Sequence, residues 1–177
     1  LKTATTLDGA VATSSGQSQW ITGAQARRFV HELRARMAAV MVGAGTARAD
    51  SCRLNVRLDD PKPWWFNEGF APHRIVVSGS GDCPAPTGDG SDRWLLGGTG
   101  LVAGFDRHLA LADDWAGTLA ELAAHGINEV LCEGGAGLAS SLLQAGVVDE
   151  WIQMVAPMTL RGSGLPAVTG AGVQALE

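Results

Sequence analysis

Charged side chains are scarce in this chain of 177 residues, and the basic ones form no long run. Charged residues make up 18% of the sequence, and the formal net charge is −5 at pH 7. An acidic chain without a basic run is a poor binder of nucleic acid, because such binding depends on cations that neutralise phosphates. No run of 18 apolar residues occurs either, so no membrane-spanning helix is predicted. The sequence therefore argues against nucleic acid and membranes as partners.

Metal-binding patterns are also missing. The three cysteines, Cys52, Cys83 and Cys132, are widely spaced, and neither C-x-x-C nor H-E-x-x-H occurs. We therefore expect no structural zinc site, no zinc deaminase and no other metal site. The four histidines, His31 among them, are scattered and are expected to lie at the surface or to pack against neighbours. Unpaired cysteines favour a reducing cytoplasm as the location.

Two further catalytic signatures are absent. The chain has no G-x-x-x-x-G-K-[ST] loop, and no histidine lies near a nucleophile elbow of the kind that carries a Ser-His-Asp triad. Kinases and serine hydrolases therefore have little support as function classes.

The chain has a large apolar fraction, 46%, arranged in alternating strand and helix patterns. Fully apolar runs such as residues 39–42 are typical of buried parallel strands. Apolar residues at helical spacing predict a helix over residues 23–37, and two further helices are expected to end at Gly126 and Gly146. Strands are expected over residues 1–7, 39–42, 74–78, 94–96, 129–132 and 151–156. This alternation predicts an α/β fold with a largely parallel sheet.

Local signals also predict turns and helix starts. Asp8-Gly9 lies between two strand-like runs, which predicts a β-hairpin. Thr22 is expected to cap the helix that follows it. Thr46 is expected either to cap a following turn or to hydrogen-bond a cofactor. Trp20 follows a polar loop, where its indole would either cover a planar ring or pack in the core.

Glycine is abundant, with 24 residues and no Gly-X-Y period. Residues 134–137 form a glycine-rich turn between a buried strand, which Glu133 follows, and a helix; residues 43–45 form a second such turn. These turns let backbone approach a phosphate, and a helix N-terminus adds free N–H groups. One interpretation is a nucleotide pyrophosphate site, and the other is a tight turn with a capping acid. Residues 97–103 imitate a dinucleotide fingerprint, but no clear helix pattern follows them.

The few basic residues are informative where they gather. Arg27 and Arg34 are seven residues apart and so lie on one helix face, and Arg53 and Arg57 flank an extended segment. Arginine forks suit a phosphate, although a solvated surface charge is the usual alternative. Lys2 lies among apolar and small residues of the first predicted strand, which favours an amine that points into a site.

Several segments, taken together, resemble the pyrimidine reductase domain of riboflavin biosynthesis. They occur in the order and at the spacing of that family between residue 1 and about residue 166, while residues 59–114 match only loosely. The matching segments are residues 1–9, 16–22, 33–36, 42–46, 49–50, 54–57, 133–139, 148–150 and 156–157.

The resemblance implies a dihydrofolate-reductase-like three-layer fold with a central, mostly parallel mixed sheet. It implies NADPH-dependent reduction of the ribosyl group of 5-amino-6-(5-phosphoribosylamino)uracil to ribityl, by a cytoplasmic homodimer that needs no metal. Residues 1–177 are expected to form one reductase domain, without a deaminase domain and without its closing C-terminal strands. The alternatives are a paralogous reductase of another pyrimidine or a pterin, and a non-catalytic nucleotide-binding domain.

Site residues follow from the resemblance position by position. Lys2 and Glu133 match polar groups near the reacting sugar, and Lys2, Glu133 or a bound water is the candidate proton donor. The residues that match substrate contacts are Ser18, Arg34, Leu54 and Arg57. The residues that match cofactor contacts are Ala4, Trp20, Thr46, Asp50, Gly135, Ala136, Gly137, Leu138 and Ala139.

Two short segments depart from the family pattern. Ser51-Cys52 stands where the family usually has Asp-Pro, which alters a loop expected beside both ligands. Ser78-Gly79 stands where the family often has Asp-Ser, so the recognition of the 2′-phosphate of NADPH is open.

Overall fold

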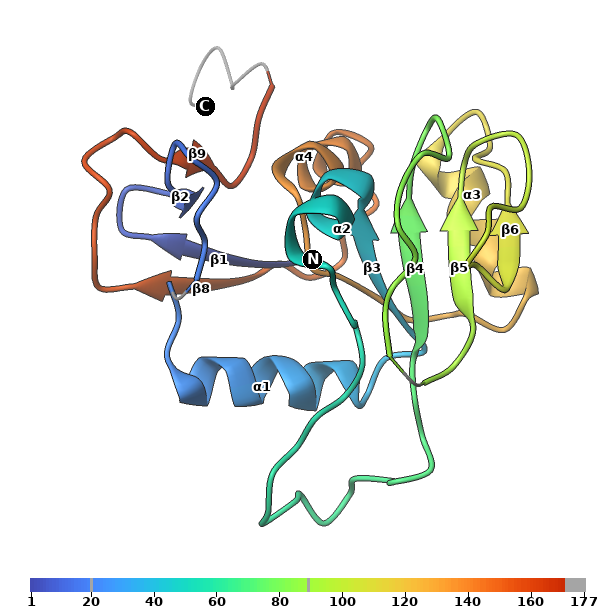
Figure 1. Ribbon diagram of the computed structural model, residues 1–177, viewed down its shortest axis with the longest axis horizontal. Helices are drawn as coiled ribbons and strands as arrows, with labels where there is room; N and C mark the ends of the chain where they lie inside the picture. Colours follow the sequence, from blue (N-terminus) through green and yellow to red (C-terminus); the bar gives the residue numbers. More distant parts are fainter. Residues whose placement is uncertain (20, 89, 171–177) are drawn as a thin grey trace.

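A parallel sheet of five strands forms the centre of the molecule (Figure 1). The computed structural model describes residues 1–19, 21–88 and 90–170. The strand order is β6-β5-β4-β3-β7, and every neighbouring pair is parallel. The strands are β3 (Ala39–Gly43), β4 (His73–Val77), β5 (Arg93–Leu96), β6 (Arg107–Leu109) and β7 (Val130–Cys132). The predicted α/β class with a mostly parallel sheet is confirmed.

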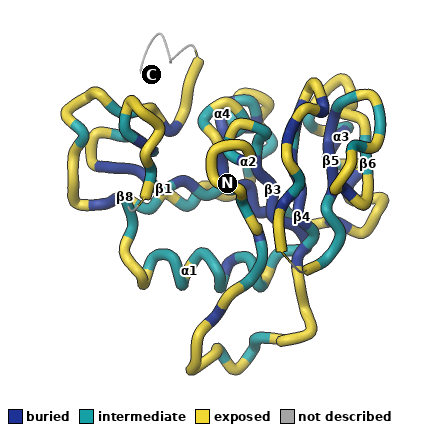
Figure 2. Tube along the Cα trace, in the orientation of Figure 1, coloured by how far each residue is buried: buried dark blue, intermediate teal, exposed yellow. Residues whose placement is uncertain are grey.

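Both faces of this sheet are covered, which explains why its central strands are apolar throughout. Met41 of β3 packs in one core cluster with Leu122 and Leu142 from two helices. The next residue, Val42, points to the other face and packs in a second cluster with Ala47. The helices are α2 (Ala44–Asp50) on the second face, and α3 (Trp115–Ala124) and α4 (Ala136–Gln144) on the first. Figure 2 shows the buried strands enclosed by more exposed helices and loops.

Two small strand pairs and a helix lie beside the central sheet (Figure 1). Strand β1 (Lys2–Thr6) pairs in parallel with β8 (Ile152–Ala156), with Lys2 opposite Ile152. Strand β2 (Ala10–Ala12) pairs antiparallel with β9 (Leu165–Pro166). Helix α1 (Ala24–Arg34) runs alongside the β1–β8 pair in the same view. Segments from the two ends of the sequence are thereby paired with each other.

The predicted hairpin at Asp8-Gly9 is wrong. A turn does form there, since the Gly9 N–H donates to the Thr6 carbonyl at 3.0 Å. The strands on either side of it, however, pair with β8 and β9 and not with each other. The β1–β8 ladder is five residues long and buries Thr5 completely, so distant pairing prevails over the local turn signal.

Helix boundaries differ from the predictions in three places. Gly23, not Thr22, occupies the N-cap of α1, and no side chain caps it, because Thr22 lies one residue too early. Helix α1 ends at Arg34 and not at residue 37. Thr46 is the third residue of α2 and so does not cap a turn.

Within the described ranges, no helix has the length and apolar character needed to cross a membrane.

Candidate active site

A cavity of about 1360 Å³ opens where β3 and β7 end, between the central sheet and β1. This is the crevice at the carboxyl ends of the strands, where open α/β sheets bind ligands. Cavities for one small molecule usually measure about 300–1000 Å³. The space therefore suits two ligands lying side by side.

Every predicted site residue that the structure describes lines this cavity. These residues are Lys2, Ala4, Ser18, Arg34, Thr46, Asp50, Leu54, Arg57, Glu133, Gly135, Ala136, Gly137, Leu138 and Ala139. Trp20, also predicted to contact a cofactor, lies outside the described residues. The fold thus gathers residues from β1, α1, α2, α4 and three loops around one space.

The two glycine-rich turns meet at one end of the cavity. The Gly43 N–H donates to the Gly134 carbonyl at 3.0 Å, so the two turns are joined directly. Gly135 is the N-cap of α4 and has a φ of +68°, and a Cβ there would lie 3.0 Å from Thr46 Oγ1. Among the described residues no side chain caps α4, so its first N–H groups remain available to an anion. This end has the shape and polarity of a pyrophosphate site.

A bidentate ion pair spans the floor of the cavity. Arg34 Nε donates to Glu133 Oε1 at 2.5 Å, and Arg34 Nη2 donates to Oε2 at 2.8 Å. Both side chains are only 11% exposed. Arg34 Nη1 also donates to the Asn55 carbonyl at 2.8 Å. Both oxygens of Glu133 therefore accept hydrogen bonds from one guanidinium, which fixes the position of the side chain.

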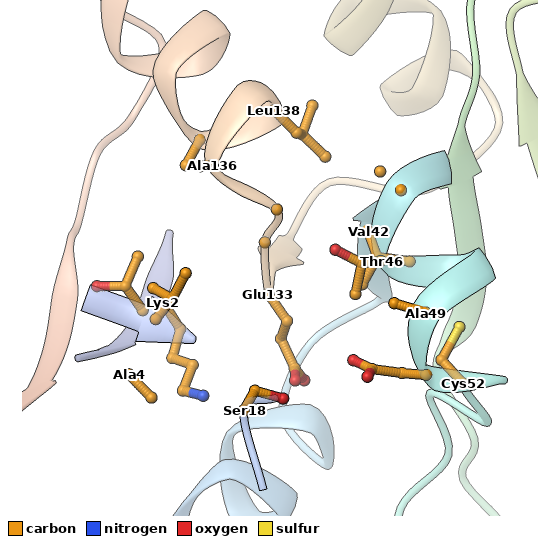
Figure 3. A pocket seen from close by; sticks show the side chains of 18 of the residues that line it. Lys2, Ala4, Ser18, Val42, Thr46, Ala49, Cys52, Glu133, Ala136 and Leu138 are labelled. Atoms are coloured by element: carbon orange, nitrogen blue, oxygen red, sulfur yellow. The ribbon is translucent and has the colours of Figure 1, made fainter. Parts of the chain in front are cut away.

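Lys2 extends from β1 into the same space as Glu133 and Ser18 (Figure 3). Burial lowers the pKa of the Lys2 ammonium, and the charge of Arg34 lowers it further, while Glu133 opposes both effects. In the part of the chain that the structure describes, no side chain or backbone group hydrogen-bonds its amine. Lys2 thus brings a half-buried amine into the cavity beside Glu133.

A wall rich in cations forms another part of the cavity lining. It combines Arg27, His31 and Arg34 of α1 with Arg53 and Arg57 of an irregular segment. Burial, together with the nearby charges of Arg34 and Arg53, lowers the pKa of Arg57. Such a wall is suited to a phosphate group.

His31 lines the cavity, although the sequence did not single it out. Its Nδ1 accepts a hydrogen bond from the Arg57 backbone N–H at 3.2 Å. Burial, and then the charges of Arg34 and Arg57, lower its pKa to about 4. The signal that could have found it is its position three residues before Arg34, which places the two side chains on one helix face.

We expect the free energy of unfolding to fall as the pH falls from about 6.5 to about 4, the window set by the lowered pKa of His31. The unfolded chain binds a proton at His31 first, so protonation favours unfolding. Allowing for the partial exposure of the ring, the loss is about 1.5 kcal/mol. Urea unfolding of the wild type and of a His31→Asn variant across this window measures it, and equal slopes would contradict the assignment. Asp8, with a pKa of about 2, acts below this window.

Trp115 and Leu111 also line the cavity, although the sequence did not single them out as site residues. Trp115 at the start of α3 donates from Nε1 to Ser141 Oγ of α4 at 2.7 Å, and both residues line the glycine-rich end, as does Leu111. Cys52, one of the departures from the family pattern, also lines the cavity, and burial raises the pKa of its thiol. These residues reach the site through packing between distant segments.

Comparisons with known proteins agree with this geometry. Residues 1–177 match the family model described as the RibD C-terminal domain. The chain is 36% identical over 165 residues to the riboflavin biosynthesis protein RibD of Corynebacterium ammoniagenes. That match covers 93% of this chain and 44% of that protein. The chain is also 34% identical over 198 residues to the 2,5-diamino-6-ribosylamino-4(3H)-pyrimidinone 5′-phosphate reductase of Methanothermobacter thermautotrophicus. This second match covers 98% of this chain and 84% of that protein.

A solved structure shows the same fold. It is a diaminohydroxyphosphoribosylaminopyrimidine deaminase/5-amino-6-(5-phosphoribosylamino)uracil reductase from Thermotoga maritima, with a TM-score of 0.81 and 27% identity. The match covers 99% of this chain and 49% of that chain. The chain thus spans about half the length of the RibD proteins that it matches.

Proposed function

The chain belongs to the RibD C-terminal domain family, and on that premise we propose that it is a pyrimidine reductase of riboflavin biosynthesis. The reaction is reduction of the ribosyl group of 5-amino-6-(5-phosphoribosylamino)uracil to a ribityl group, with NADPH as the reductant. One observation carries the proposal: a single cavity is lined by the two joined glycine turns, by Lys2 and the Arg34–Glu133 pair, and by further arginines.

The glycine-rich end fits a nicotinamide dinucleotide. The Gly135 turn, where a Cβ would crowd Thr46, and the uncapped start of α4 would hold the pyrophosphate. When bound, the dinucleotide supplies a hydride to C1 of the opened sugar. The role of the chain is to hold the two ligands close and aligned, which is the main catalytic contribution in a transfer of this kind.

The wall of cations fits the phosphate of the substrate. Arg57 is available at that wall through its guanidinium, which also donates to the Asn55 side chain. A guanidinium has five N–H donors, and Arg34 uses three of them on Glu133 and Asn55. Its remaining N–H groups can contact the substrate while the Glu133 carboxylate keeps the guanidinium in place.

Lys2 is the proton donor that the geometry favours. As the hydride adds to C1 of the sugar imine, the electron pair of the C=N bond moves to nitrogen, which takes a proton. Glu133 is ill suited to give that proton, because both of its carboxyl oxygens accept hydrogen bonds from the Arg34 guanidinium. The Lys2 ammonium has protons to give and a lowered pKa, and after transfer it is left as a neutral amine that solvent reprotonates.

The proposal is tested with the purified chain, NADPH and the precursor, by following oxidation of the reduced nicotinamide and formation of the ribityl product. Equal amounts of oxidised cofactor and product are expected. The undeaminated precursor is the second candidate substrate, because a relative named for the diaminopyrimidinone reaction is 34% identical and is covered over 84% of its length. No oxidation with either compound would contradict the proposal, and turnover of dihydrofolate alone would favour a paralogous reductase.

Three finer expectations accompany the proposal and stay predictions: NADPH in preference to NADH, a homodimer, and a location in the cytoplasm. A comparison of kcat/KM for the two nicotinamides tests the first, and it bears directly on Ser78-Gly79, which replaces the family's usual Asp-Ser. Light scattering of the purified chain tests the second.

Replacing Gly135 by alanine is expected to raise the Kd for NADPH at least about tenfold. The positive φ disfavours a side chain by about 1–2 kcal/mol, and the new Cβ would lie 3.0 Å from Thr46 Oγ1, so either the Thr46 side chain or the turn must give way. Fluorescence titration with NADPH measures the effect. Gly146→Ala is the matched control: its φ of +66° is similar and it follows the same helix, but it lies away from the cavity. Equal losses of NADPH affinity in both variants would contradict the role of the turn.

A further inference from the structure

The wall segment, defined as residues 53–58, lies against the cavity without the support of secondary structure. In the described part of the chain, these residues form no helix or strand and make no hydrogen bond to another backbone group. Leu54 is 3% exposed and anchors the segment in the core, with a φ of +54°. Leu58 is 9% exposed and anchors the segment a second time, so the backbone between the two leucines is left to hydrogen bonds from side chains.

Two side chains of α1 supply that support. Arg34 Nη1 donates to the Asn55 carbonyl at 2.8 Å, and His31 Nδ1 accepts the Arg57 N–H at 3.2 Å. His31 and Arg34 are three residues apart and so project from the same face of the helix. Two hydrogen bonds from α1 side chains therefore hold the backbone of the wall segment, one at a carbonyl and the other at an N–H.

The bond to Arg57 requires a neutral imidazole. Nδ1 can accept only when it carries no proton, which places the ring hydrogen on Nε2. Burial and the charges of Arg34 and Arg57 favour this neutral state, while Glu133 and the Asn55 backbone oppose it more weakly. Protonation would remove the acceptor and set a cation between two arginines.

We infer that His31 is a positioning residue for substrate: its Nδ1 fixes the Arg57 peptide and so sets where the wall segment meets the substrate phosphate. The inference rests on the proposed function for the identity of the substrate, but not for the hydrogen bond itself. His31 touches no reacting atom in this scheme, and its effect passes through the position of Arg57.

Two variants separate the ring's acceptor from its other properties. His31→Ala removes the acceptor, whereas His31→Asn places an amide oxygen where Nδ1 lies. We expect hydrogen exchange at the Arg57 amide, followed by NMR on the full chain, to quicken at least about tenfold in His31→Ala and to stay within about threefold of the wild type in His31→Asn. Unchanged exchange in His31→Ala would overturn the inference.

The functional consequence is measured separately. In His31→Ala the KM for the pyrimidine precursor should rise about tenfold while the KM for NADPH changes less than twofold, and His31→Asn should recover most of the loss. Equal defects in both variants would assign the effect to Nε2 and overturn the inference. If the wild type does not turn over the precursor, the proposed function fails, yet amide exchange and calorimetry with D-ribose 5-phosphate still test whether His31 positions the wall.

Discussion

Replacing Glu133 by alanine is expected to lower the free energy of unfolding by about 3 kcal/mol and to weaken substrate binding far more than NADPH binding. The loss is large because Arg34 would keep its charge at 11% exposure with no carboxylate beside it. Breaking a buried ion pair from one side typically costs about 3–5 kcal/mol, and the slight exposure of this pair favours the lower end. Urea unfolding and separate titrations with the two ligands measure the two effects.

Arg34→Ala is the reciprocal variant, and the pair forms a double-mutant cycle. Each single change leaves one charge unpaired, so the double variant should be less destabilised than the sum of the two single variants. Arg34→Ala should also weaken substrate binding far more than NADPH binding, because the proposed substrate contacts use the guanidinium N–H groups that Glu133 and Asn55 leave available. Additive stability losses would show that the two groups act independently, and equal losses for both ligands would contradict the substrate role.

The central sheet was predictable because its strands carry the signal in their own composition. The run Ala39–Gly43 is buried along its length, and a strand covered on both faces must be apolar throughout. Strand β6 lacks that signal, since Arg107 is exposed and only three residues are involved. Strand β9 has two residues, both exposed. Short strands at the margin are formed by their neighbours and not by their own pattern.

In the candidate site, too, some features have a local sequence signal and others do not. The glycine turns could be found from the sequence because Gly135 has a positive φ, a backbone conformation that favours glycine over other residues. The Arg34–Glu133 bond joins residues 99 positions apart, and nothing in either neighbourhood indicates the other. His31 needed one more step, since its spacing from Arg34 is visible but its bond to the Arg57 backbone depends on an irregular loop. Pairwise geometry between distant segments is what the sequence alone could not supply.

Replacing Lys2 by methionine is expected to lower kcat about a thousandfold with little change in KM and no loss of stability. Removal of a general acid typically costs 10²–10⁴-fold in rate. Stability should hold or rise slightly, because burial of the ammonium is unfavourable, as its lowered pKa shows. Stopped-flow measurement of single turnovers isolates the reduction step from product release. A kcat within about fivefold of the wild type would assign the proton to another source, such as bound water.

The pH dependence distinguishes an acid from a fixed charge. An ammonium that donates must be protonated, so the rate should be constant at low pH and fall as the pH rises through the pKa of Lys2, which lies below 10.5. Lys2→Arg keeps the charge but has no titration in this range, so its low rate should not show that alkaline fall.

Glu133 belongs to the ion pair and also affects the pH dependence of the rate, through the pKa of Lys2. Its negative charge raises the pKa of Lys2, whereas Arg34 lowers it. In a Glu133→Gln variant the raising effect is lost, so the alkaline fall in rate should move to lower pH while Lys2 remains the donor. The opposite displacement, or none, would mean that the titrating group is not Lys2. A shift in the predicted direction would tie the ion pair, the proton donor and the reduction step to one electrostatic arrangement.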